Sequence, residues 1–592
     1  MNVAEFFVSI MQRLGTDCVF SLTGGMAMHV NRAVGVSGLK TIYCNHEQAC
    51  VAAADGYARM HEYQVPGFAV VTSGPGVTNI MTSLASAHHD SVPLVVVAGQ
   101  VKRADLNRFA VRSYGAQEVP SLEMIRPIVK DALRYDAATI DDQRLAEFFS
   151  AALSGRKGPV FVEIPLDVQP LQVPTAADRL DRLVLDIRAL VAKRAPLDPG
   201  HREIIRASAA RSERPVVFIG NGVRIAGLSR ERIRALIDRL GAPALFTWPS
   251  ADLVDSEHPL CFGRPGGLAA THSNQIIQNA DFILFLGTRL DLLTTGFNPA
   301  LFGKRAFRVV VDVDSNELDK LSHLPHACLA TADVESAIDW LERQDDLDLH
   351  RPQWTRHCET LRRDDAALEA QSFGNTPALN ARNIARAFSE KLAGTTIVAT
   401  GSGYAIEGFA RFWEPTRGNR LVFAGHCLGS MGMGLPDAIG AAAAKLGPVI
   451  CLEGDGGLML NLQELLTLQA NSDLSLCVGI MNNDGYLSIS RSQARAFGTQ
   501  FGASATSGLG SADFPALAEC FGLEYMRVES REELCALLDS IASGRSRIMF
   551  DMRMSDDDYR GPAIVTRFRD DGSPYSSDIE DVSWRTGPTV TS

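Results

Sequence analysis

The residues best suited to chemistry lie in one stretch of the chain, 449–489. It contains the glycine-rich turn 454–457 and, further on, the pair Asn482-Asn483. Asp455 offers a carboxylate oxygen and Asn483 an amide oxygen, and both are hard ligands that suit Mg²⁺. The glycines beside the aspartate allow backbone N–H groups to approach a diphosphate closely. The stretch therefore predicts a site for magnesium and a diphosphate group.

Two strands and a helix must hold these groups in place. We expect a strand at 449–452, a helix at about 461–470 and a second strand at about 474–481. Asn461 and Glu464 have the spacing of a cap at the start of that helix. A unit of this kind forms adjacent parallel strands with a right-handed crossover. The aspartate and the asparagine then leave the same carboxyl edge of the sheet, where open α/β sheets bind ligands.

The bulk composition sets broad limits on the function. A chain of 592 residues is too long for one hydrophobic core, so we expect three domains. The net charge of −12 and the pI of about 5.6 disfavour nucleic acid or a membrane surface as a partner. The 11 cysteines include no CxxC pair, and the apolar runs have the length of strands. No secretory signal is visible at the N-terminus, so we expect a cytoplasmic protein.

Strands and helices alternate in three successive parts of the chain. This alternation predicts an α/β protein with three doubly wound domains, each on a parallel sheet. Proline-rich and charged helical stretches separate the three parts, and the polar C-terminal end is expected to form an extended strap or to be partly disordered. The expected organisation is a first domain at 1–170, a linker at 171–200, a central domain at 201–342, a linker at 343–380, a third domain at 381–555 and a tail at 556–592.

Three further motifs occur in a fixed order with the stretch described above. They are Glu47 within NHEQA, the loop SGPGVTN at 73–79 and the run GSMGMGLPDAIGA at 429–441. With these motifs, residues 1–555 resemble the acetolactate synthase-like thiamine diphosphate (ThDP) enzymes. The resemblance implies a pyrimidine-binding first domain, a central domain of nucleotide-binding type and a diphosphate-binding third domain. AMHVNRA, CNHEQA, GAQEV and NNDGYLSI are most similar to bacterial enzymes that transfer an acetyl unit from pyruvate to a nucleotide-linked keto-deoxysugar.

The resemblance assigns the catalytic role to Glu47. In this family a glutamate hydrogen-bonds the aminopyrimidine ring of ThDP and promotes its imino tautomer, and Glu47 matches that residue within NHEQA and the following ADGYAR. The alternative interpretation is a carboxylate at the start of a helix, where the helix dipole stabilises it.

The resemblance also assigns the residues that hold the cofactor and its metal. Asp455, Asn483 and the carbonyl group of Gly485 would bind Mg²⁺. Met431 matches the bulky residue that bends ThDP, although a glycine run of this kind is also compatible with simple helix packing. The other positions expected around the cofactor are Gly401, Ser402, Gly403, Gly429, Ser430, Gly454, Gly456, Gly457, Asn483, Gly485 and Tyr486.

Substrate contacts are expected mainly from the first domain. Three residues match positions that line the substrate funnel of the family: Gly25 in the TGG loop, Gln117 in GAQEV and Lys130 in RPIVK. His29 suits that funnel or a packed surface position equally. His88 and His89 precede a strand and do not lie in the later loop where pyruvate decarboxylases carry a histidine pair, so we interpret both as structural.

Two departures from related enzymes bear on the reaction type. Pyruvate decarboxylases carry a proton-donating glutamate at the position of Ile489, and housekeeping acetolactate synthases carry a tryptophan at the position of Ser492. Without the proton donor, the acyl carbanion equivalent should attack a carbonyl acceptor. The smaller serine leaves room for a larger acceptor than 2-oxobutyrate, so we expect both residues to lie on the substrate side.

The central domain carries a weaker nucleotide-binding pattern. A GNG turn at 220–222 follows a strand, and GTRLDLLTTG at 287–296 and VDVD at 311–314 resemble the flavin-binding pattern of the synthases. The resemblance thus implies FAD in a structural role. A vestigial nucleotide-binding fold without flavin is the alternative.

The leading interpretation is a ThDP- and Mg²⁺-dependent carboligase that decarboxylates pyruvate and transfers the acetyl unit to a ketone, such as a nucleotide-linked keto-deoxysugar. The alternatives are an ordinary acetolactate synthase, a flavin-dependent 2-oxo acid oxidase and a non-catalytic interaction protein. The intact Glu47, Asp455 and Asn483 argue against the last of these. The resemblance also implies a homodimer or homotetramer that acts on small molecules.

Overall fold

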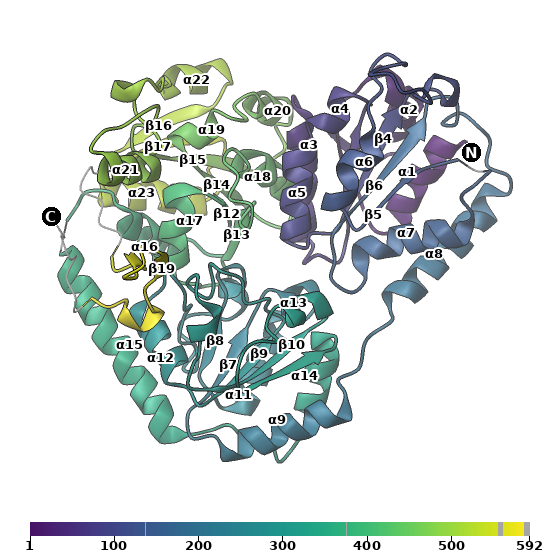
Figure 1. Ribbon diagram of the computed structural model, residues 1–592. Helices are drawn as coiled ribbons and strands as arrows, with labels where there is room; N and C mark the ends of the chain where they lie inside the picture. The colour runs from purple at the N-terminus through teal and green to yellow at the C-terminus, as the bar shows by residue number, and fades with distance from the viewer. Residues whose placement is uncertain (137, 375, 555–560, 585–592) are drawn as a thin grey trace.

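Three α/β domains make up the protein (Figure 1). The computed structural model describes residues 1–136, 138–374, 376–554 and 561–584. Each domain is built on a parallel sheet, which confirms the predicted fold class. In Figure 1 the first and third domains lie side by side, and the central domain lies below both. None of the helices in these described ranges is long and apolar enough to cross a membrane.

The first domain contains a six-stranded sheet in the order β2-β1-β3-β4-β6-β5. Its strands are β1 Cys18–Ser21, β2 Lys40–Tyr43, β3 Gly67–Val71, β4 Leu94–Gln100, β5 Asp131–Arg134 and β6 Pro159–Pro165. Its helices are α1 Val3–Arg13, α2 Met28–Val36, α3 Glu47–Met60, α4 Pro75–Thr78, α5 Met81–His89, α6 Ser121–Ile125 and α7 Asp142–Leu153. A capping box starts α1, because Asn2 and Glu5 each accept a hydrogen bond from the backbone N–H of the other.

The third domain repeats this strand order. Its sheet runs β13-β12-β14-β15-β17-β16, so its strands occupy the same relative places as those of the first domain. The strands are β12 Thr396–Thr400, β13 Arg420–Ala424, β14 Val449–Gly454, β15 Leu476–Asn482, β16 Glu524–Val528 and β17 Ile548–Arg553. The helices are α16 Ala381–Lys391, α17 Gly403–Phe412, α18 Gly434–Ala443, α19 Asp455–Leu458, α20 Glu464–Ala470, α21 Leu487–Phe497, α22 Phe514–Cys520 and α23 Arg531–Ala542.

The central domain has a different, five-stranded sheet in the order β11-β10-β9-β7-β8. Its strands are β7 Pro215–Ile219, β8 Ala244–Phe246, β9 Phe282–Leu286, β10 Phe307–Asp312 and β11 Ala327–Thr331. Its helices are α9 Pro199–Arg211, α10 Gly222–Ile225, α11 Arg230–Leu240, α12 Thr271–Asn279, α13 Ser315–Asp319 and α14 Val334–Glu342. The long helix α15, Pro352–Phe373, then leads towards the third domain along the outside of the molecule (Figure 1).

One hydrophobic core joins the first and third domains through α3 and α18. The two helices approach so closely that a Cβ atom on Gly56 would collide with the carbonyl oxygen of Asp437. A Cβ atom on Gly440 would collide with the carbonyl oxygen of Ala53 in the same way. Glycine is therefore required at both contact points, and the junction is a rigid platform for the loops at its ends.

The stretch predicted as a linker, 171–200, contains a long helix. This helix is α8, Ala176–Val191, which packs on α7 and α1 of the first domain. The four buried apolar residues of α8 recur every three or four positions, as expected for an amphipathic helix: Leu180, Leu183, Val184 and Ile187. The prolines on either side of α8 are typical of a linker, whereas the apolar periodicity between them predicts a helix.

The predicted cap at Asn461 and Glu464 is wrong. The helix begins only at Glu464, and the short helix α19 precedes it. The amide of Asn461 donates to the carbonyl oxygen of Gly432 at 2.7 Å. The buried Glu464 carboxylate accepts from the backbone N–H of Asn45 in the first domain at 3.1 Å and from the hydroxyl of Thr467 at 2.6 Å. Contacts between distant segments have replaced the local cap.

The described part of the tail, 561–584, runs as a strap over the central and third domains. It forms a small hairpin from β18, Thr566–Phe568, and β19, Pro574–Ser576. Lys304 of the central domain binds Asp578 at 2.6 Å and Glu580 at 2.9 Å, which anchors the strap by charge. Residues 556–560 and 585–592 of the predicted tail lie outside the described residues.

Candidate active site

The GDG turn and the asparagine pair lie side by side, as the sequence predicts. Strands β14 and β15 pair in parallel, with Gly454 opposite Met481, so Asp455 and Asn483 leave neighbouring strand ends. A carboxylate oxygen of Asp455 accepts a hydrogen bond from the backbone N–H of Gly485 at 2.6 Å. Burial raises the pKa of Asp455 to about 6, a cost that a bound cation would offset. The turn therefore holds a carboxylate ready for a metal ion.

The neighbouring residues fit a magnesium ion and a diphosphate. The amide oxygen of Asn483 is buried and has no hydrogen-bond partner among the described residues. Positive φ angles at Asp484, 62°, and Gly485, 132°, turn the backbone sharply after the strand. A Cβ atom on Gly456 would collide with the ring of Tyr486, so only glycine fits under that ring. The set offers a carboxylate, an unpaired amide oxygen and close backbone, which is the donor set for Mg²⁺.

The other cofactor positions predicted in the third domain lie at the same edge of its sheet. Residues 401–403 follow β12 and residues 425–431 follow β13, and both strands belong to the sheet that holds β14. Gly401 packs directly against Gly425. Met431 is half-buried, and Gly429 has a φ of 69° with open space around it. The structure thus brings the GSG, GSM, GDG and NN segments to one sheet edge.

Sequence reasoning missed Glu453, the residue before the GDG turn. Its side chain is fully buried, and one carboxylate oxygen accepts from the backbone N–H of Gly434 at 2.6 Å while the other has no partner among the described residues. Burial raises its pKa to about 7. Its contact ties the start of α18 to the GDG turn. The available signal was a charged residue inside the otherwise apolar strand VICLEG.

The first domain contributes a second group of residues around Glu47. Glu47 is the first residue of α3 and is nearly buried. Its carboxylate accepts a hydrogen bond from the side-chain amide of Asn79 at 2.9 Å. Asn79 ends the SGPGVTN loop, and the backbone of Gln117 packs against Gly74 of that loop. The motif was recognised from the sequence, but the role of Asn79 in holding Glu47 was not.

The remaining predicted substrate residues are divided between two places. Gly24, next to Gly25, packs on Thr72, so the TGG loop borders the same loop cluster as Glu47. The backbone N–H of His29 donates to the side chain of Gln169 at 3.2 Å. Lys130 lies instead where β5 and β6 begin, and its ammonium donates to the carbonyl oxygen of Ser154 at 2.8 Å. The structure does not bring Lys130 to the other predicted residues.

The structure places the histidine pair at the end of α5 and the residues Ile489 and Ser492 on the helix after Asn483. His88 and His89 end α5, away from the loops at the carboxyl edge of the sheet. Ile489 and Ser492 lie on α21 and are exposed, and the hydroxyl of Ser492 donates to the carbonyl oxygen of Ser488 at 2.8 Å. Both residues are free to border a substrate that binds beside Asn483.

Comparison with known proteins covers all three domains. Residues 1–124, 207–341 and 401–551 match, respectively, the N-terminal thiamine pyrophosphate-binding, central and C-terminal thiamine pyrophosphate-binding domains of the thiamine pyrophosphate enzymes. A rice protein named probable acetolactate synthase 2, chloroplastic, is 32% identical over 97% of this chain and 87% of its own length. The chain belongs to the acetolactate synthase-like ThDP enzymes.

Relatives of this ThDP enzyme also occur in bacteria and archaea. The large subunit of acetolactate synthase isozyme 2 from Escherichia coli is 29% identical over 91% of this chain and 93% of its own length. A probable acetolactate synthase large subunit from Methanococcus aeolicus is 28% identical over 90% of this chain and 89% of its own length. The similarity therefore spans the whole architecture.

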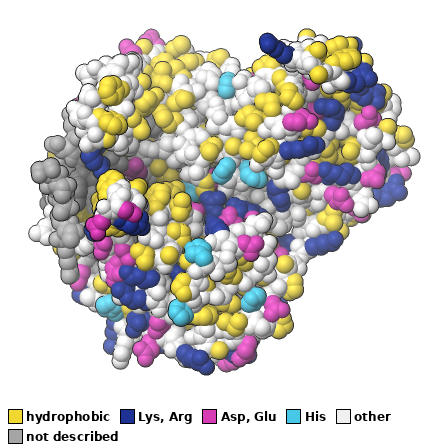
Figure 2. All heavy atoms as spheres, viewed as in Figure 1, with side chains coloured by type: hydrophobic (Ala, Val, Ile, Leu, Met, Phe, Trp, Pro, Cys, Tyr) yellow, Lys and Arg dark blue, Asp and Glu magenta, His cyan; other side chains and the backbone are white. Residues whose placement is uncertain are grey.

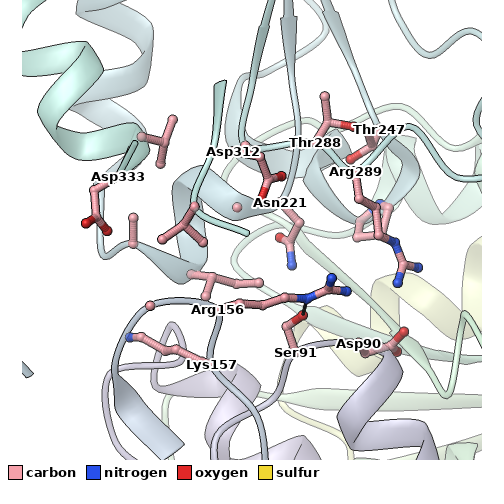
Figure 3. Close-up of a pocket in the computed structure, with 18 of the residues that line it drawn as sticks. Asp90, Ser91, Arg156, Lys157, Asn221, Thr247, Thr288, Arg289, Asp312 and Asp333 are labelled. Carbon is pink, nitrogen blue, oxygen red and sulfur yellow. Dashed lines mark hydrogen bonds between the residues drawn. The ribbon is translucent and has the colours of Figure 1, made fainter. Parts of the chain in front are cut away.

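This ThDP enzyme also has a large cavity where its three domains meet, which we call the interdomain cavity (Figure 3). The GNG turn after β7 and the GTR turn after β9 form one wall. These two strands are neighbours at the point where the central sheet reverses its strand order, which is where such sheets bind nucleotides. Asp312 ends β10 at the same edge. The predicted nucleotide segments are thus brought together.

The first domain supplies cations to the interdomain cavity, which sequence reasoning did not foresee. Arg156 and Lys157 both line the cavity, and in Figure 3 Arg156 reaches across it towards Asn221, whereas the Lys157 side chain extends away from Asn221. Burial lowers the pKa of Lys157 to about 7, and its ammonium donates to the carbonyl oxygen of Tyr63 at 2.8 Å. Arg156 pairs with Asp314 at 3.0 Å. A cavity with glycine turns on one wall and cations on another fits a nucleotide with a diphosphate.

Proposed function

We propose that this ThDP enzyme decarboxylates pyruvate and adds the resulting acetyl unit to a ketone. When bound, ThDP supplies the electron sink for the decarboxylation. The observation that carries the proposal is the grouping of Asp455, the unpartnered amide oxygen of Asn483 and the backbone of Gly485 at one sheet edge. The three relatives described above are named acetolactate synthase or probable acetolactate synthase, and these names support the same class of reaction.

The magnesium ion is assigned to Asp455, Asn483 and the carbonyl of Gly485. These groups provide two side-chain oxygens and one backbone oxygen, and Mg²⁺ would take its remaining ligands from the diphosphate and water. Gly403 of the GSG segment and Gly454 of the GDG segment have open space where a Cβ atom would lie, which leaves room for the diphosphate beside them. Removal of the metal with EDTA should therefore release the cofactor.

Glu47 is assigned as the residue that holds a proton at the aminopyrimidine ring. Its position at the start of α3 and its hydrogen bond from Asn79 fix the carboxylate in one orientation. An amide at this position would keep the shape and lose the exchangeable carboxyl proton. The role itself comes from the family resemblance, and the fixed geometry supports it.

A homodimer or homotetramer is proposed because the candidate site consists of two groups of residues that do not share a cavity within one chain. We call these the half-sites: the first-domain group around Glu47 and the third-domain group around Asp455. The cavity lined by Asp455, Gly456 and Tyr486 does not include Glu47 among the described residues. Large apolar side chains are exposed near both halves, including Met459 and Tyr43. Apolar groups also cluster on the face over the first and third domains in Figure 2. A second copy would cover them and complete the site.

The acceptor is proposed to be larger than pyruvate, such as a nucleotide-linked keto-deoxysugar. Ile489 and Ser492 lie exposed on the helix that follows the metal-binding turn, so neither supplies a carboxyl proton donor or a large ring there. Ordinary acetolactate synthesis is the second candidate, and the names of the relatives favour it.

FAD in a structural role is proposed for the interdomain cavity, with a nucleotide fold that binds no flavin as the alternative.

The test of this function is carbon-13 pyruvate consumption followed by NMR, with and without a panel of ketones. We expect slow formation of acetolactate from pyruvate alone and little acetaldehyde. A bulky ketone should accelerate pyruvate consumption at least tenfold, which corresponds to about 1.4 kcal/mol in the barrier. If pyruvate alone forms acetolactate rapidly and no larger ketone competes, the larger acceptor is excluded and the enzyme is an ordinary acetolactate synthase. Stoichiometric reduction of bound flavin by pyruvate under anaerobic conditions would instead indicate an oxidase.

A further inference from the structure

We propose that Asp90, His426 and Cys427 form a binding site for a zinc-class divalent metal ion at one end of the interdomain cavity. Asp90 follows α5 in the first domain, and His426 and Cys427 follow β13 in the third domain. One ligand atom from each residue lies within 4.8 Å of the other two. The proposed ThDP chemistry does not use this cluster, so the metal site and the ThDP-dependent function can be tested independently.

The spacing of the three ligand atoms suits tetrahedral coordination. The sulfur of Cys427 lies 3.1 Å from Nδ1 of His426, and that nitrogen lies 3.7 Å from Oδ1 of Asp90. Zinc ligands at about 2.0–2.3 Å from the metal are separated from one another by roughly 3.3–3.6 Å in a tetrahedron. Small side-chain adjustments would therefore place an ion between the three atoms.

The chemistry of the ligands selects the class of metal. Thiolate and imidazole are soft or borderline ligands that favour Zn²⁺ over Mg²⁺ or Ca²⁺, and the carboxylate adds a second negative charge. Asp90 and His426 are both nearly fully buried as side chains, so the site would bind an ion by fixed groups and not by mobile surface chains. The backbone N–H of Cys427 donates to Oδ1 of Asp90 at 3.2 Å and already orients that carboxylate.

Two arginines border the cluster and must be compatible with a bound cation. Arg59 binds the other oxygen of Asp90, Oδ2, at 2.8 Å, which leaves Oδ1 for the metal. Arg59 is itself neutralised by Asp55. Arg289 contacts the sulfur of Cys427, but it also donates to the carbonyl oxygen of His89 at 2.8 Å.

Arg289 can therefore give up its sulfur contact and keep its other contacts. Besides the carbonyl oxygen of His89, it lies 3.4 Å from the carboxylate of Asp291. This pair limits the repulsion between the guanidinium and the ion. A metal ion in the cluster would need to replace only one of the contacts of Arg289.

The position of the cluster gives the ion a role between domains. Its ligands come from the first and third domains, and all three residues line the interdomain cavity together with Arg289. Figure 3 shows Asp90 and Arg289 at the same end of that cavity. Three protein ligands leave a fourth position, which would face the cavity and accept water or an anionic group of a cavity ligand. The ion would thus join two domains and contact whatever the cavity holds.

The direct test is X-ray absorption at the zinc edge on protein that carries one equivalent of Zn²⁺, with Mg²⁺ and ThDP in excess. The magnesium site assigned above contains only oxygen ligands, so a sulfur neighbour at about 2.3 Å is specific for a cysteine site. We expect that sulfur in the wild type and in Cys535→Ser, a control at another partly exposed cysteine, and its loss in Cys427→Ser. A zinc shell without sulfur in the wild type, or a sulfur shell that persists in Cys427→Ser, would overturn the proposal.

A second measurement needs no substitution and so avoids any folding defect. Alkylation by iodoacetamide, mapped by mass spectrometry on the wild type, should slow at Cys427 by at least tenfold when zinc is added. Cys520 is exposed and provides the internal control, because its labelling should not change. Equal labelling of Cys427 with and without zinc would contradict the site, while magnesium-dependent ThDP binding would remain as a separate result.

Discussion

The first and third domains have the same strand order but hold different chemistry in equivalent loops. The loop after β3 in the first domain is SGPGVTN, and its Asn79 holds Glu47 by a hydrogen bond. The equivalent loop after β14 in the third domain is the GDG turn, and its Asp455 leaves the strand end next to the one that Asn483 leaves. One loop supports a carboxylate, and the other supplies one to a metal. The comparison teaches that topology fixes where loops meet, whereas a few residues within them decide the chemistry.

The largest expected effect comes from breaking the metal-binding loop. Asp455→Ala should weaken ThDP binding in excess Mg²⁺ by at least a hundredfold, because the ion that links the carboxylate to the diphosphate is lost. Isothermal calorimetry measures the affinity. The control is Asp345→Ala, a fully exposed aspartate just after the central domain, which should leave the affinity unchanged. Equal affinities for the wild type and Asp455→Ala would remove Asp455 from the site.

The second prediction tests the contact that unites the two domains. Gly56→Ala should lower the free energy of unfolding by about 3 kcal/mol, because the new methyl group collides with the backbone of α18. Gly35→Ala is the matched control, since that helical glycine has open space around its Cβ position and alanine favours the helix. Chemical denaturation compares the two variants. A Gly56→Ala protein as stable as Gly35→Ala would show that the helices can separate freely.

The predictable features are those encoded by local sequence. Alternating strands and helices gave the three sheets, and the GDG and NN motifs gave the neighbouring Asp455 and Asn483. The partners of Glu464 and Asn79 could not be read, because their hydrogen bonds cross between segments far apart in the chain. A capping pattern looks the same whether its side chains turn back to their own helix or reach another domain.

The interdomain cavity shows the same limit on a larger scale. Its glycine turns follow central-domain strands and were visible in the sequence. Arg156 and Lys157 reach it only because the first domain packs against the central one. No local pattern encodes such packing. The helix α8 is different, since its apolar periodicity is present in the sequence and is enough to predict a helix within 171–200.

The third prediction concerns the pH dependence of the junction between the first and third domains. Burial raises the pKa of Glu464 to about 7 from an ordinary value of 4.5. The folded protein therefore binds this proton more tightly than the unfolded chain, so the contribution is complete below pH 4.5 and is lost as pH rises through 7. Relative to Glu464→Gln, the wild type should lose about 2 kcal/mol of stability between pH 5 and pH 8.

The check for Glu464 is denaturant unfolding of both proteins at several pH values, with the exposed Glu519→Gln as the control. The control should follow the wild type over the whole range. If the free energy of unfolding changes with pH in the same way in the wild type and in Glu464→Gln, Glu464 titrates normally and does not make the junction between the domains sensitive to pH.

The smallest expected effect concerns acceptor size beside the third-domain half-site. Ser492→Trp should slow transfer to a bulky ketone by about tenfold while sparing acetolactate formation, because the ring fills space next to the reacting groups. Ser543→Trp is the matched control, since this exposed serine directly after α23 also donates to the carbonyl oxygen four residues earlier. Competition between pyruvate and the ketone, followed by NMR, reports the ratio. An equal loss for both acceptors would mean that Ser492 does not select by volume.

The central claim is that one loop holds the Glu47 carboxylate at the cofactor while the GDG turn binds the metal. Its most direct test is hydrogen–deuterium exchange at C2 of ThDP bound to Glu47→Gln, followed by NMR after acid quenching. The substitution keeps the size of the side chain and the oxygen that accepts from Asn79, so ThDP affinity should stay within about tenfold of the wild type. We expect C2 exchange to fall to the rate of free ThDP, because the amide cannot provide the carboxyl proton that the aminopyrimidine ring needs. Exchange at the wild-type rate in Glu47→Gln would contradict the account.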